Sequence, residues 1–387
     1  MTTNNNNEHK KLNAPSLRFP EFDGEWEGHL LSEYLDFKNG LNPDSKRFGN
    51  GIKFISVMDI LNNPIITYDS IIASVQATKT EISTFSVEYG DILFQRSSET
   101  LEDVGRANVY IDNKVAIFGG FVIRGKKKAN YNPLFFRYVL ASPHSRKKII
   151  PMGAGAQHFN IGQDGLSKVT INFPVIEEQD KIANLLRLLD ERISTQTGLI
   201  DRLQSLMVGI RHLLIKRVNG KIVYLREISK VYQPQTISTA DLTDTGYPVY
   251  GANGIIGHYT SYNHKTEQIC IACRGNTCGV VNYTKPTSWI TGNAMVINAD
   301  DYQNMVYKRY LYHYLSAYNF KNIISGSGQP QIVRSPLEKL KIVLPTMFEQ
   351  ERIAKSLDWL QNMIDVNINV LNLYTHQKQY LLHQMFI

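Results

Sequence analysis

Polar side chains that can hydrogen-bond to base edges cluster after strand-like runs and in glycine-bearing loops. Arginine, asparagine, glutamine, serine and threonine read bases in a DNA groove, and a neighbouring glycine lets the backbone approach a duplex closely. An alternative interpretation is that these loops are simply exposed and polar. The candidate DNA contacts are Arg96, Ser97, Ser98, Thr100, Gln157, His158 and Asn160 in the first half of the chain, and Arg274, Asn276, Thr277, Gln329 and Gln331 in the second.

Basic runs offer a second kind of DNA contact, to phosphate. Lys126 and Lys127 stand in a run that begins at Arg124, and Arg146–Lys148 forms another. The chain has 42 Lys and Arg against 35 Asp and Glu, a net charge of +7, which suits a polyanionic partner. A solvated face is the alternative for each lysine run. We expect Lys126 and Lys127 to neutralise DNA phosphates.

Patterns for catalysis are incomplete. Gly120–Lys127 has the spacing of a phosphate-binding loop, but Lys127 stands where the magnesium-binding hydroxyl is required. Asn132-Pro133 lacks the second proline of an amino-methyltransferase motif, and Pro133 is better interpreted as the first turn of a helix. No Ser-His-Asp set or carboxylate pair stands out. The sequence therefore predicts no catalytic residue and no cofactor bound by this chain.

The three cysteines, Cys270, Cys273 and Cys278, could suggest zinc. The fourth ligand would have to be His258 or His264, at irregular spacing, whereas structural zinc sites have closed, paired ligand sets. Because Cys270 lies in an alternating apolar run, we interpret it as a core residue. We therefore expect no metal site.

An internal repeat with a period of 171 residues organises the chain. Leu166–Pro174 is followed by Glu178-Gln179, and Leu337–Pro345 is followed by Glu349-Gln350. Each half thus ends in a strand-like alternation, a proline and an acidic entry into a helix.

An apolar seam with alternating spacings of four and three residues follows each proline, which predicts a long heptad helix. The polar interruption Gln196 in the first seam matches Asn367 in the second. The first seam is Ile182, Leu186, Leu189, Ile193, Gln196, Ile200, Leu203, Met207, Ile210 and Leu214, and the second is Ile353, Leu357, Leu360, Ile364, Asn367, Leu371, Tyr374, Lys378, Leu381 and Met385.

A helix with one narrow apolar stripe cannot bury that stripe alone. The order globule, helix, globule, helix makes an antiparallel pair the simplest solution, with Gln196 near Asn367. The seam would then form a rod of roughly 50 Å at about 1.5 Å per residue. The alternative is that each helix packs on its own globule.

The globules also resemble each other. Gly90–Arg96 is similar to Glu267–Arg274, and Ile117–Ile123 to Ile290–Ile297, so we expect Arg96 and Arg274 to correspond. Helices are predicted at Leu134–Leu140 and Tyr310–Leu315. The fold class is α+β, with two similar domains separated by a long two-helix antiparallel coiled coil. We expect a disordered tail (1–16), domain 1 (17–174), helix 1 (175–217), domain 2 (218–345) and helix 2 (346–387).

This layout resembles the specificity subunits of type I restriction–modification systems. The resemblance is carried by Leu17–Phe22, Gly24–Trp26, Tyr247–Gly257, Ser288–Asn293 and the Glu-Gln helix entries. It implies two target-recognition domains that read the halves of a bipartite, asymmetric double-stranded DNA site, and helices that scaffold two methyltransferase subunits. Two restriction/translocase subunits complete the nuclease, and S-adenosylmethionine, ATP and Mg belong to these partners. The resemblance implies a non-catalytic cytoplasmic protein.

Two other function classes remain open. One is a two-headed coiled-coil adaptor that binds proteins rather than DNA. The other is a self-contained DNA methyltransferase or nuclease.

Overall fold

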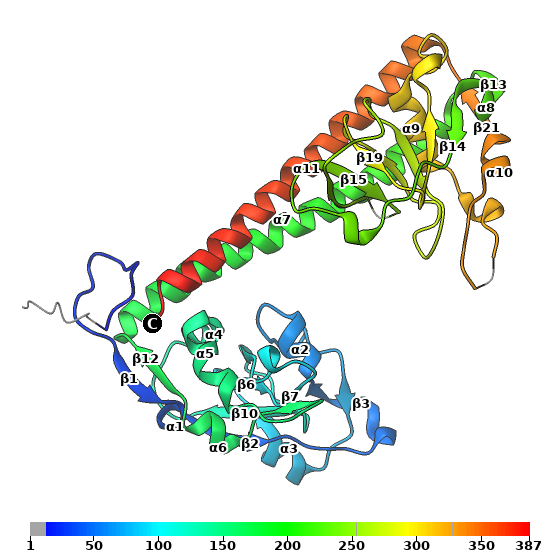
Figure 1. Ribbon diagram of the computed structural model, residues 1–387. Coiled ribbons are helices and arrows are strands. Elements are labelled where there is room, and N and C mark those ends of the chain that lie inside the picture. The colour runs from blue at the N-terminus through cyan, green and yellow to red at the C-terminus, as the bar shows by residue number, and fades with distance from the viewer. Residues whose placement is uncertain (1–12, 253, 327) are drawn as a thin grey trace, which may run out of the picture. The chain divides into compact units, whose positions relative to one another are not determined.

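The computed structural model describes residues 13–252, 254–326 and 328–387, which form two compact units (Figure 1). Unit 1 extends to Gln196 and takes in Val370–Ile387 from the other end of the chain. Unit 2 comprises the segment between them, from Thr197 to Asn369. Each unit therefore contains one globule and one end of each of two long helices.

A four-stranded antiparallel sheet with the order β2-β10-β6-β8 forms the centre of unit 1. Its inner strand β6 is completely buried because it is a continuous apolar run ending in Gln95. A second sheet has the order β4-β3-β9-β5, and two-stranded pairs join β1 to β12 and β7 to β11. The strands are β1 Glu27–Leu30, β2 Leu35–Asn39, β3 Phe48–Ile55, β4 Ser74–Val75, β5 Ser86–Val87, β6 Ile92–Gln95, β7 Ser97–Ser98, β8 Ala107–Val109, β9 Ala116–Phe118, β10 Val122–Lys127, β11 Phe159–Asn160 and β12 Thr170–Phe173.

Short helices cover the sheets of unit 1. Pro133 is the first residue of α4, and the Asn132 Oδ1 accepts the Phe135 N–H at 2.9 Å, which confirms the expected helix start. The helices are α1 Leu31–Tyr34, α2 Val57–Asn62, α3 Lys79–Phe85, α4 Pro133–Ala141, α5 Pro143–Ile149 and α6 Gln163–Ser167.

Unit 2 repeats the central framework. Its four-stranded sheet has the order β14-β20-β17-β18, which matches β2-β10-β6-β8 strand for strand, and β13 pairs with β21 as β1 pairs with β12. A hairpin, β15-β16, pairs with β19. The elements are β13 Lys221–Tyr224, α8 Leu225–Ile228, β14 Lys230–Tyr232, β15 Tyr247–Gly251, β16 Gly254–Tyr259, β17 Ile269–Ala272, β18 Val281–Tyr283, β19 Trp289–Ile290, β20 Ala294–Asn298, α9 Lys308–Ala317, α10 Arg334–Glu338 and β21 Lys341–Leu344.

The repeated glutamine has the same structural role in both units. In unit 1 the buried Gln179 donates to the Pro174 carbonyl at 3.0 Å, and its Oε1 accepts the Asn132 N–H at 3.1 Å. In unit 2 Gln350 donates to Pro345 at 3.1 Å and accepts the Tyr307 N–H at 2.8 Å. One amide thus joins the start of each long helix to the preceding strand and to the helix of the globule.

The long helices are α7, Ile176–Arg217, and α11, Met347–Gln384. In unit 1 the first turns of α7 share a hydrophobic core with the last turns of α11, and in unit 2 the last turns of α7 share a core with the first turns of α11. The helices therefore pair antiparallel within each unit, as predicted. Both cores also include side chains of the globules, so the helices pack on each other and on their globules together.

The predicted seam separates buried from exposed side chains. Leu186 and Leu357 are fully buried, whereas apolar residues off the seam such as Leu188 and Trp359 are exposed. The seam residue Lys378 of α11 forms an ion pair with Asp190 of α7, with its Nζ 2.5 Å from the Asp190 Oδ1. Asn367 donates to the Met363 carbonyl, and its expected proximity to Gln196 stays a prediction, as does the length of the rod.

None of the described helices is long and apolar enough to cross a membrane. The N-terminal segment 13–26 leads into β1, and Asn13 exchanges two hydrogen bonds with Trp26, at 2.6 and 2.7 Å. Of the expected tail, residues 1–12 lie outside the described part of the chain.

We predict that Leu186→Ala lowers the free energy of unfolding of unit 1 by about 2–5 kcal/mol, because it leaves a cavity between α7, α11 and the globule. Leu188→Ala, whose side chain is 45% exposed on the same helix, should change it by less than about 0.5 kcal/mol. Guanidinium titrations monitored by circular dichroism measure both. Equal losses for the two variants would contradict the seam.

A second prediction concerns pH. His313 on α9 is fully buried with its Nε2 2.7 Å from the Asp358 Oδ1, beside Arg309 and Arg211. Burial lowers the pKa of His313 below its ordinary 6.5, and Asp358 opposes this shift. The unfolded chain then binds a proton that the native state excludes, so the free energy of unfolding of unit 2 should fall as pH decreases below about 6.5.

His313→Gln should remove this part of the pH dependence, since the amide keeps a donor for Asp358 but does not titrate. His212→Gln, an exposed change on α7, is the matched control and should keep the wild-type slope. Urea titrations between pH 5 and 8 provide the measurement. A His313→Gln slope equal to wild type would refute the assignment.

Candidate nucleic-acid interface

The end of β6 brings several predicted DNA contacts together in unit 1. The Arg96 N–H donates to the Phe121 carbonyl at 2.9 Å, and the Arg96 carbonyl accepts the Ile161 N–H at 3.0 Å. Directly beyond, β7 pairs antiparallel with β11, which sets Ser97 opposite Asn160. Arg96, Ser97, Ser98 and Asn160 are therefore brought together by the pairing of β7 with β11.

Hydrogen bonds hold these side chains in place. The Ser97 hydroxyl donates to the Asn160 Oδ1 at 2.5 Å, and the Arg96 Nη1 donates to the Gly120 carbonyl at 3.2 Å. Arg96 and Asn160 line a cavity of about 400 Å³ together with Asn39 and residues 161–164. The lining of the cavity is largely polar and includes the side chains of Asn39, Arg96 and Asn160.

The loop before β11 presents two further candidates at its tip. Gln157 and His158 are exposed there. Gly155 has a φ of +147°, and a Cβ at this position would lie 2.0 Å from the His158 carbonyl oxygen, so the turn requires glycine. Thr100 is exposed as well, and its N–H donates to the Ser98 hydroxyl at 3.2 Å.

Unit 2 builds a corresponding surface at the end of β17. The Cys273 N–H donates to the Asn293 carbonyl at 3.1 Å, and the Cys273 carbonyl accepts the Ile332 N–H at 3.0 Å. Arg274 and Gln331 form an isolated antiparallel β-bridge through their backbones, and both residues are exposed. Arg274, Gln331 and Arg334 line a cavity of about 350 Å³.

The remaining candidates of unit 2 lie in two adjacent turns. Asn276 is exposed and Thr277 is half-buried in the turn after Arg274. Gln329 is exposed in the neighbouring loop, where Gly326 has a φ of +91°. Ser327 in this loop lies outside the described residues. The Gly275 N–H donates to the Pro330 carbonyl at 3.0 Å, which joins the two turns.

The expected correspondence of Arg96 with Arg274 was wrong by one residue. The Arg96 backbone bonds to Phe121 and Ile161 through its N–H and its carbonyl. The Cys273 backbone bonds in the same way to Asn293 and Ile332, so Cys273 is the counterpart of Arg96. Ser97 is therefore the counterpart of Arg274. The error arose because the similarity was matched at the two arginines, whereas the ladder between the central strands decides the register.

Two exposed residues that the sequence did not single out lie beside these surfaces. Phe121 precedes β10 with 67% of its surface exposed, and Asn293 is exposed in the same place before β20. A Cβ at Gly120 would lie 1.8 Å from the Oδ1 of the exposed Asn42 side chain, which packs against this turn. In the sequence, the signal that could have identified Phe121 was a phenylalanine directly after the two glycines that interrupt an apolar run.

Lys126 and Lys127 lie at the opposite end of β10 from Val122, which neighbours the Arg96 surface. Lys126 lies 3.2 Å from Glu88, and Lys127 donates to the Tyr131 carbonyl at 3.0 Å. Burial lowers the pKa of Lys127. The structure does not bring these lysines to the Arg96 surface, and their contact with phosphate stays a prediction.

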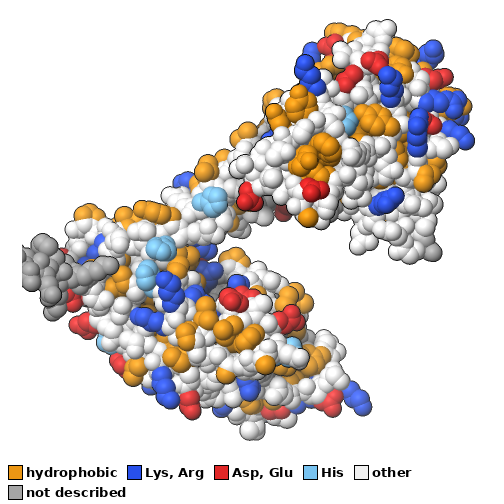
Figure 2. Space-filling view, viewed as in Figure 1, with side chains coloured by type: hydrophobic (Ala, Val, Ile, Leu, Met, Phe, Trp, Pro, Cys, Tyr) orange, Lys and Arg blue, Asp and Glu red, His pale blue; other side chains and the backbone are white. Residues whose placement is uncertain are grey.

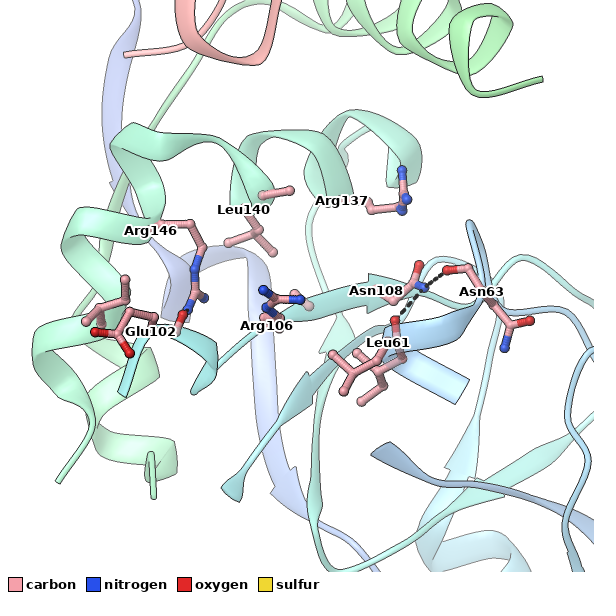
Figure 3. Close-up of a pocket in the computed structure, with 12 residues that line it drawn as sticks. Leu61, Asn63, Glu102, Arg106, Asn108, Arg137, Leu140 and Arg146 are labelled. Atoms are coloured by element: carbon pink, nitrogen blue, oxygen red, sulfur yellow. Dashed lines mark hydrogen bonds between the residues drawn. The ribbon is translucent and has the colours of Figure 1, made fainter. Parts of the chain in front are cut away.

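Three arginines line a cavity of about 380 Å³ between α4, α5 and β8 (Figure 3). Arg146 donates to the carbonyls of Glu102 and Val104 at 2.8 and 2.6 Å, and its buried Nη1 has no hydrogen-bond partner among the described residues. Burial and the charge of Arg106 lower the pKa of Arg146 to about 10, so it stays charged at neutral pH. Arg106 lies between Arg146 and Arg137 (Figure 3). Two of these arginines are ion-paired, because the Arg106 Nη2 lies 2.6 Å from the Asp103 Oδ1 and the Arg137 Nη1 lies 3.2 Å from the Asp190 Oδ2.

The cysteines occupy separate environments. Cys270 and Cys273 belong to different hydrophobic cores, and burial raises the pKa of Cys270 to about 12. The His264 nitrogens lie 2.8 Å from the Tyr232 hydroxyl and 2.6 Å from the Asn263 Oδ1. Within the described ranges, no three His, Cys, Asp or Glu side chains are grouped as metal ligands.

Comparisons with known proteins agree with this architecture. A family model described as the type I restriction modification DNA specificity domain matches residues 24–205 and 218–373. The EcoprrI specificity subunit of Escherichia coli is 32% identical over 146 residues, and a putative specificity subunit of Haemophilus influenzae is 31% identical over 117. The chain spans 36% and 29% of the length of these two relatives.

Two further comparisons cover nearly the whole chain. A putative type I restriction enzyme specificity subunit, MjaX of Methanocaldococcus jannaschii, is 23% identical over 398 residues, 92% of each chain. The structure of the type I restriction–modification S subunit from M. genitalium has the same fold, with a TM-score of 0.65 at 17% identity over 97% of this chain and 99% of that one. Because the two matched segments make up most of the sequence, the protein belongs to the family of type I restriction–modification DNA specificity domains.

Proposed function

We propose that this protein is the non-catalytic DNA-reading subunit of a type I restriction–modification complex, and that each unit reads one half of a bipartite, asymmetric site. One observation carries the proposal. Two frameworks with the same strand order and backbone hydrogen bonds present different polar side chains at equivalent positions.

The differences are those that distinguish bases. Ser97 in unit 1 corresponds to Arg274 in unit 2, Asn160 to Gln331, and Phe121 to Asn293. Arginine binds guanine edges, glutamine and asparagine bind adenine, and an aromatic ring can contact the thymine methyl group. Identical side chains at these positions would favour a palindrome. Different ones favour two unlike half-sites.

Phosphate contacts would supply affinity without sequence preference. The cavity lined by Arg106, Arg137 and Arg146 offers three guanidinium groups, of which Arg106 exchanges Asp103 and Arg137 exchanges Asp190 for phosphate, and the net charge of +7 favours a polyanion. Contacts of this kind position a protein on the duplex, while base contacts specify the sequence.

The long helices would receive the partner subunits. Apolar side chains off the seam, including Leu206, Val208, Trp359 and Leu373, are between 50% and 67% exposed, and Figure 2 shows apolar side chains along the helix surfaces. Exposed apolar surface of this kind marks a protein interface. We assign it to two methyltransferase subunits, joined in the full complex by two restriction/translocase subunits. S-adenosylmethionine, ATP and Mg would act in these partners.

We predict that Arg274→Ala relaxes one half of the recognised motif. Losing a bidentate base contact should reduce discrimination at one or two base pairs about 5- to 150-fold and leave the other half and the spacer unchanged. Methylome sequencing of a host that carries the variant and its methyltransferase partner reads this directly.

The matched control is Arg226→Ala, an exposed arginine on α8 of the same unit, which should leave the motif intact. Relaxation of both halves by Arg274→Ala would show that one unit does not serve one half-site. Failure of the wild-type chain to confer any methylation pattern with its partner would instead favour the protein-binding adaptor.

Arg106→Ala should weaken retention of random duplexes uniformly, because it removes a phosphate contact rather than a base contact. The slope of log K against log salt should become smaller by about 1. Gel shifts across a salt series test this with Lys114→Ala as control, whose side chain is 60% exposed elsewhere on unit 1. An unchanged slope for Arg106→Ala would exclude the arginine cavity from the DNA interface.

A further inference from the structure

Residues 13–26 of unit 1 pack across the start of α7 and the end of α11. The Arg18 guanidinium binds the fully buried Glu178 carboxylate in bidentate fashion, with Nε–Oε1 at 2.8 Å and Nη2–Oε2 at 2.7 Å. The remaining Nη1 donates to the Gly24 carbonyl at 2.6 Å. At the other helix, the Leu17 N–H donates to the Gln384 carbonyl at 2.9 Å.

Lys181 on α7 forms the second contact with this segment. It pairs with Glu21, and its ammonium lies 5.9 and 5.6 Å from the ring centres of Phe19 and Phe22. The segment Leu17–Phe22 thus supplies one arginine, one carboxylate and two aromatic rings. These side chains match the Glu178 and Lys181 pair by charge and by cation–π contact.

Unit 2 repeats the receptor side of this arrangement. Glu349 and Arg352 stand 171 residues after Glu178 and Lys181, on the first turns of α11, as Pro345 stands after Pro174. Unit 2 has no counterpart of the covering segment Leu17–Phe22. The link between the end of α7 at Arg217 and the start of β13 at Lys221 is too short to contain one.

A groove lies at this place in unit 2, with a volume of about 530 Å³. We call it the α7–α11 groove, and its lining includes Leu213, Leu214, Val218, Pro345, Glu349 and Arg352. Glu349 pairs with Arg352 at 2.7 Å and keeps 38% of its side chain exposed, whereas Glu178 has none exposed. The groove therefore combines apolar walls with an accessible carboxylate and an accessible guanidinium.

We propose that the α7–α11 groove binds a short segment of a partner subunit that presents an arginine next to aromatic residues, in the way that Leu17–Phe22 covers the equivalent site in unit 1. The arginine binds Glu349, an acidic residue of the segment binds Arg352, and the aromatic rings cover Leu213 and Val218. This inference rests on the proposed role of the chain as an assembly subunit.

A second copy of this chain fits the groove less well than a partner subunit does. The N-terminal segment of a second copy would have to leave its own unit, where Arg18 binds the buried Glu178 and Trp26 is buried against Phe135 and Phe386. Breaking a buried charge pair leaves a buried carboxylate unpaired and is strongly destabilising.

A labelled peptide with the sequence of Pro15–Glu25 tests the groove on the full-length protein by fluorescence anisotropy. We expect saturable binding to one site. Replacing the arginine of the peptide by alanine should weaken binding at least about 10-fold, because the bidentate ion pair is lost. Glu349→Gln in the protein should weaken binding of the unmodified peptide by a similar factor, and Arg352→Glu should weaken it as well.

Two protein variants serve as controls. Glu351→Gln removes a neighbouring exposed carboxylate that pairs with Lys355, and it should leave peptide binding unchanged. Glu178→Gln should also leave it unchanged if the peptide occupies unit 2. The proposal is overturned if the peptide shows no saturation at about 1 mM, if Glu349→Gln binds it as wild type does, or if Glu178→Gln alone abolishes binding.

The docking proposal and the proposed DNA-reading function fail separately. Glu349→Gln should retain DNA as wild type does in a gel shift, because the groove holds no proposed base contact. Peptide binding without any DNA retention would sustain the groove and refute DNA reading. DNA retention without peptide binding would support DNA reading and refute the groove as a peptide-binding site.

Discussion

The mutual burial of two apolar seams is the constraint from which the rest of the architecture follows. Each long helix has one narrow apolar stripe, which is unstable in water unless another surface covers it. In unit 1 the start of α7 meets the end of α11, and in unit 2 the end of α7 meets the start of α11. Unit 2 is the continuous segment Thr197–Asn369, whereas unit 1 is made from two separate stretches of the chain. Unit 1 depends on Val370–Ile387, which the whole of unit 2 separates in sequence from the rest of unit 1.

The attachment of each globule to its helix is equally specific. Gln179 and Gln350 each use both ends of a buried amide to join a helix start, a strand end and the first turn of the globule's helix. Because an unsatisfied buried amide is costly, this joint holds the globule in one orientation on its helix end. The loops at the ends of β6 and β17 are thus carried on frameworks that are fixed to the helix ends, which suits the proposed role in reading DNA.

The two units differ in the exposed side chains that their common framework carries. Their central sheets keep the same strand order, yet Ser97 and Arg274 occupy the same backbone position with different chemistry. The ends of the helices differ too, since Arg18 covers Glu178 in unit 1 while Glu349 stays accessible in unit 2. The repeated framework keeps the packing the same, whereas the exposed side chains differ between the two units.

The sequence by itself determined the features that depend on local periodicity. The heptad spacing identified the seam, including Leu186 and Leu357, because a helix repeats its faces every three to four residues whatever surrounds it. The repeat indicated two related α+β units, and the proline of the Asn132-Pro133 pair marked a helix start. Ser97 and Asn160 were each identified as candidates from the sequence, as polar residues after a strand and after a glycine loop, but their proximity was not.

Only the tertiary structure decided what depends on pairing between distant segments. The register that matches Ser97, rather than Arg96, with Arg274 comes from ladder hydrogen bonds between strands far apart in the chain. Arg106 and Arg146 share a cavity although 40 residues separate them, and no local pattern encodes that proximity. The accessibility of Glu349 likewise follows from what α7 leaves uncovered. Local spacing fixes which face a residue occupies, whereas the partner of that face is chosen by the packing of the whole unit.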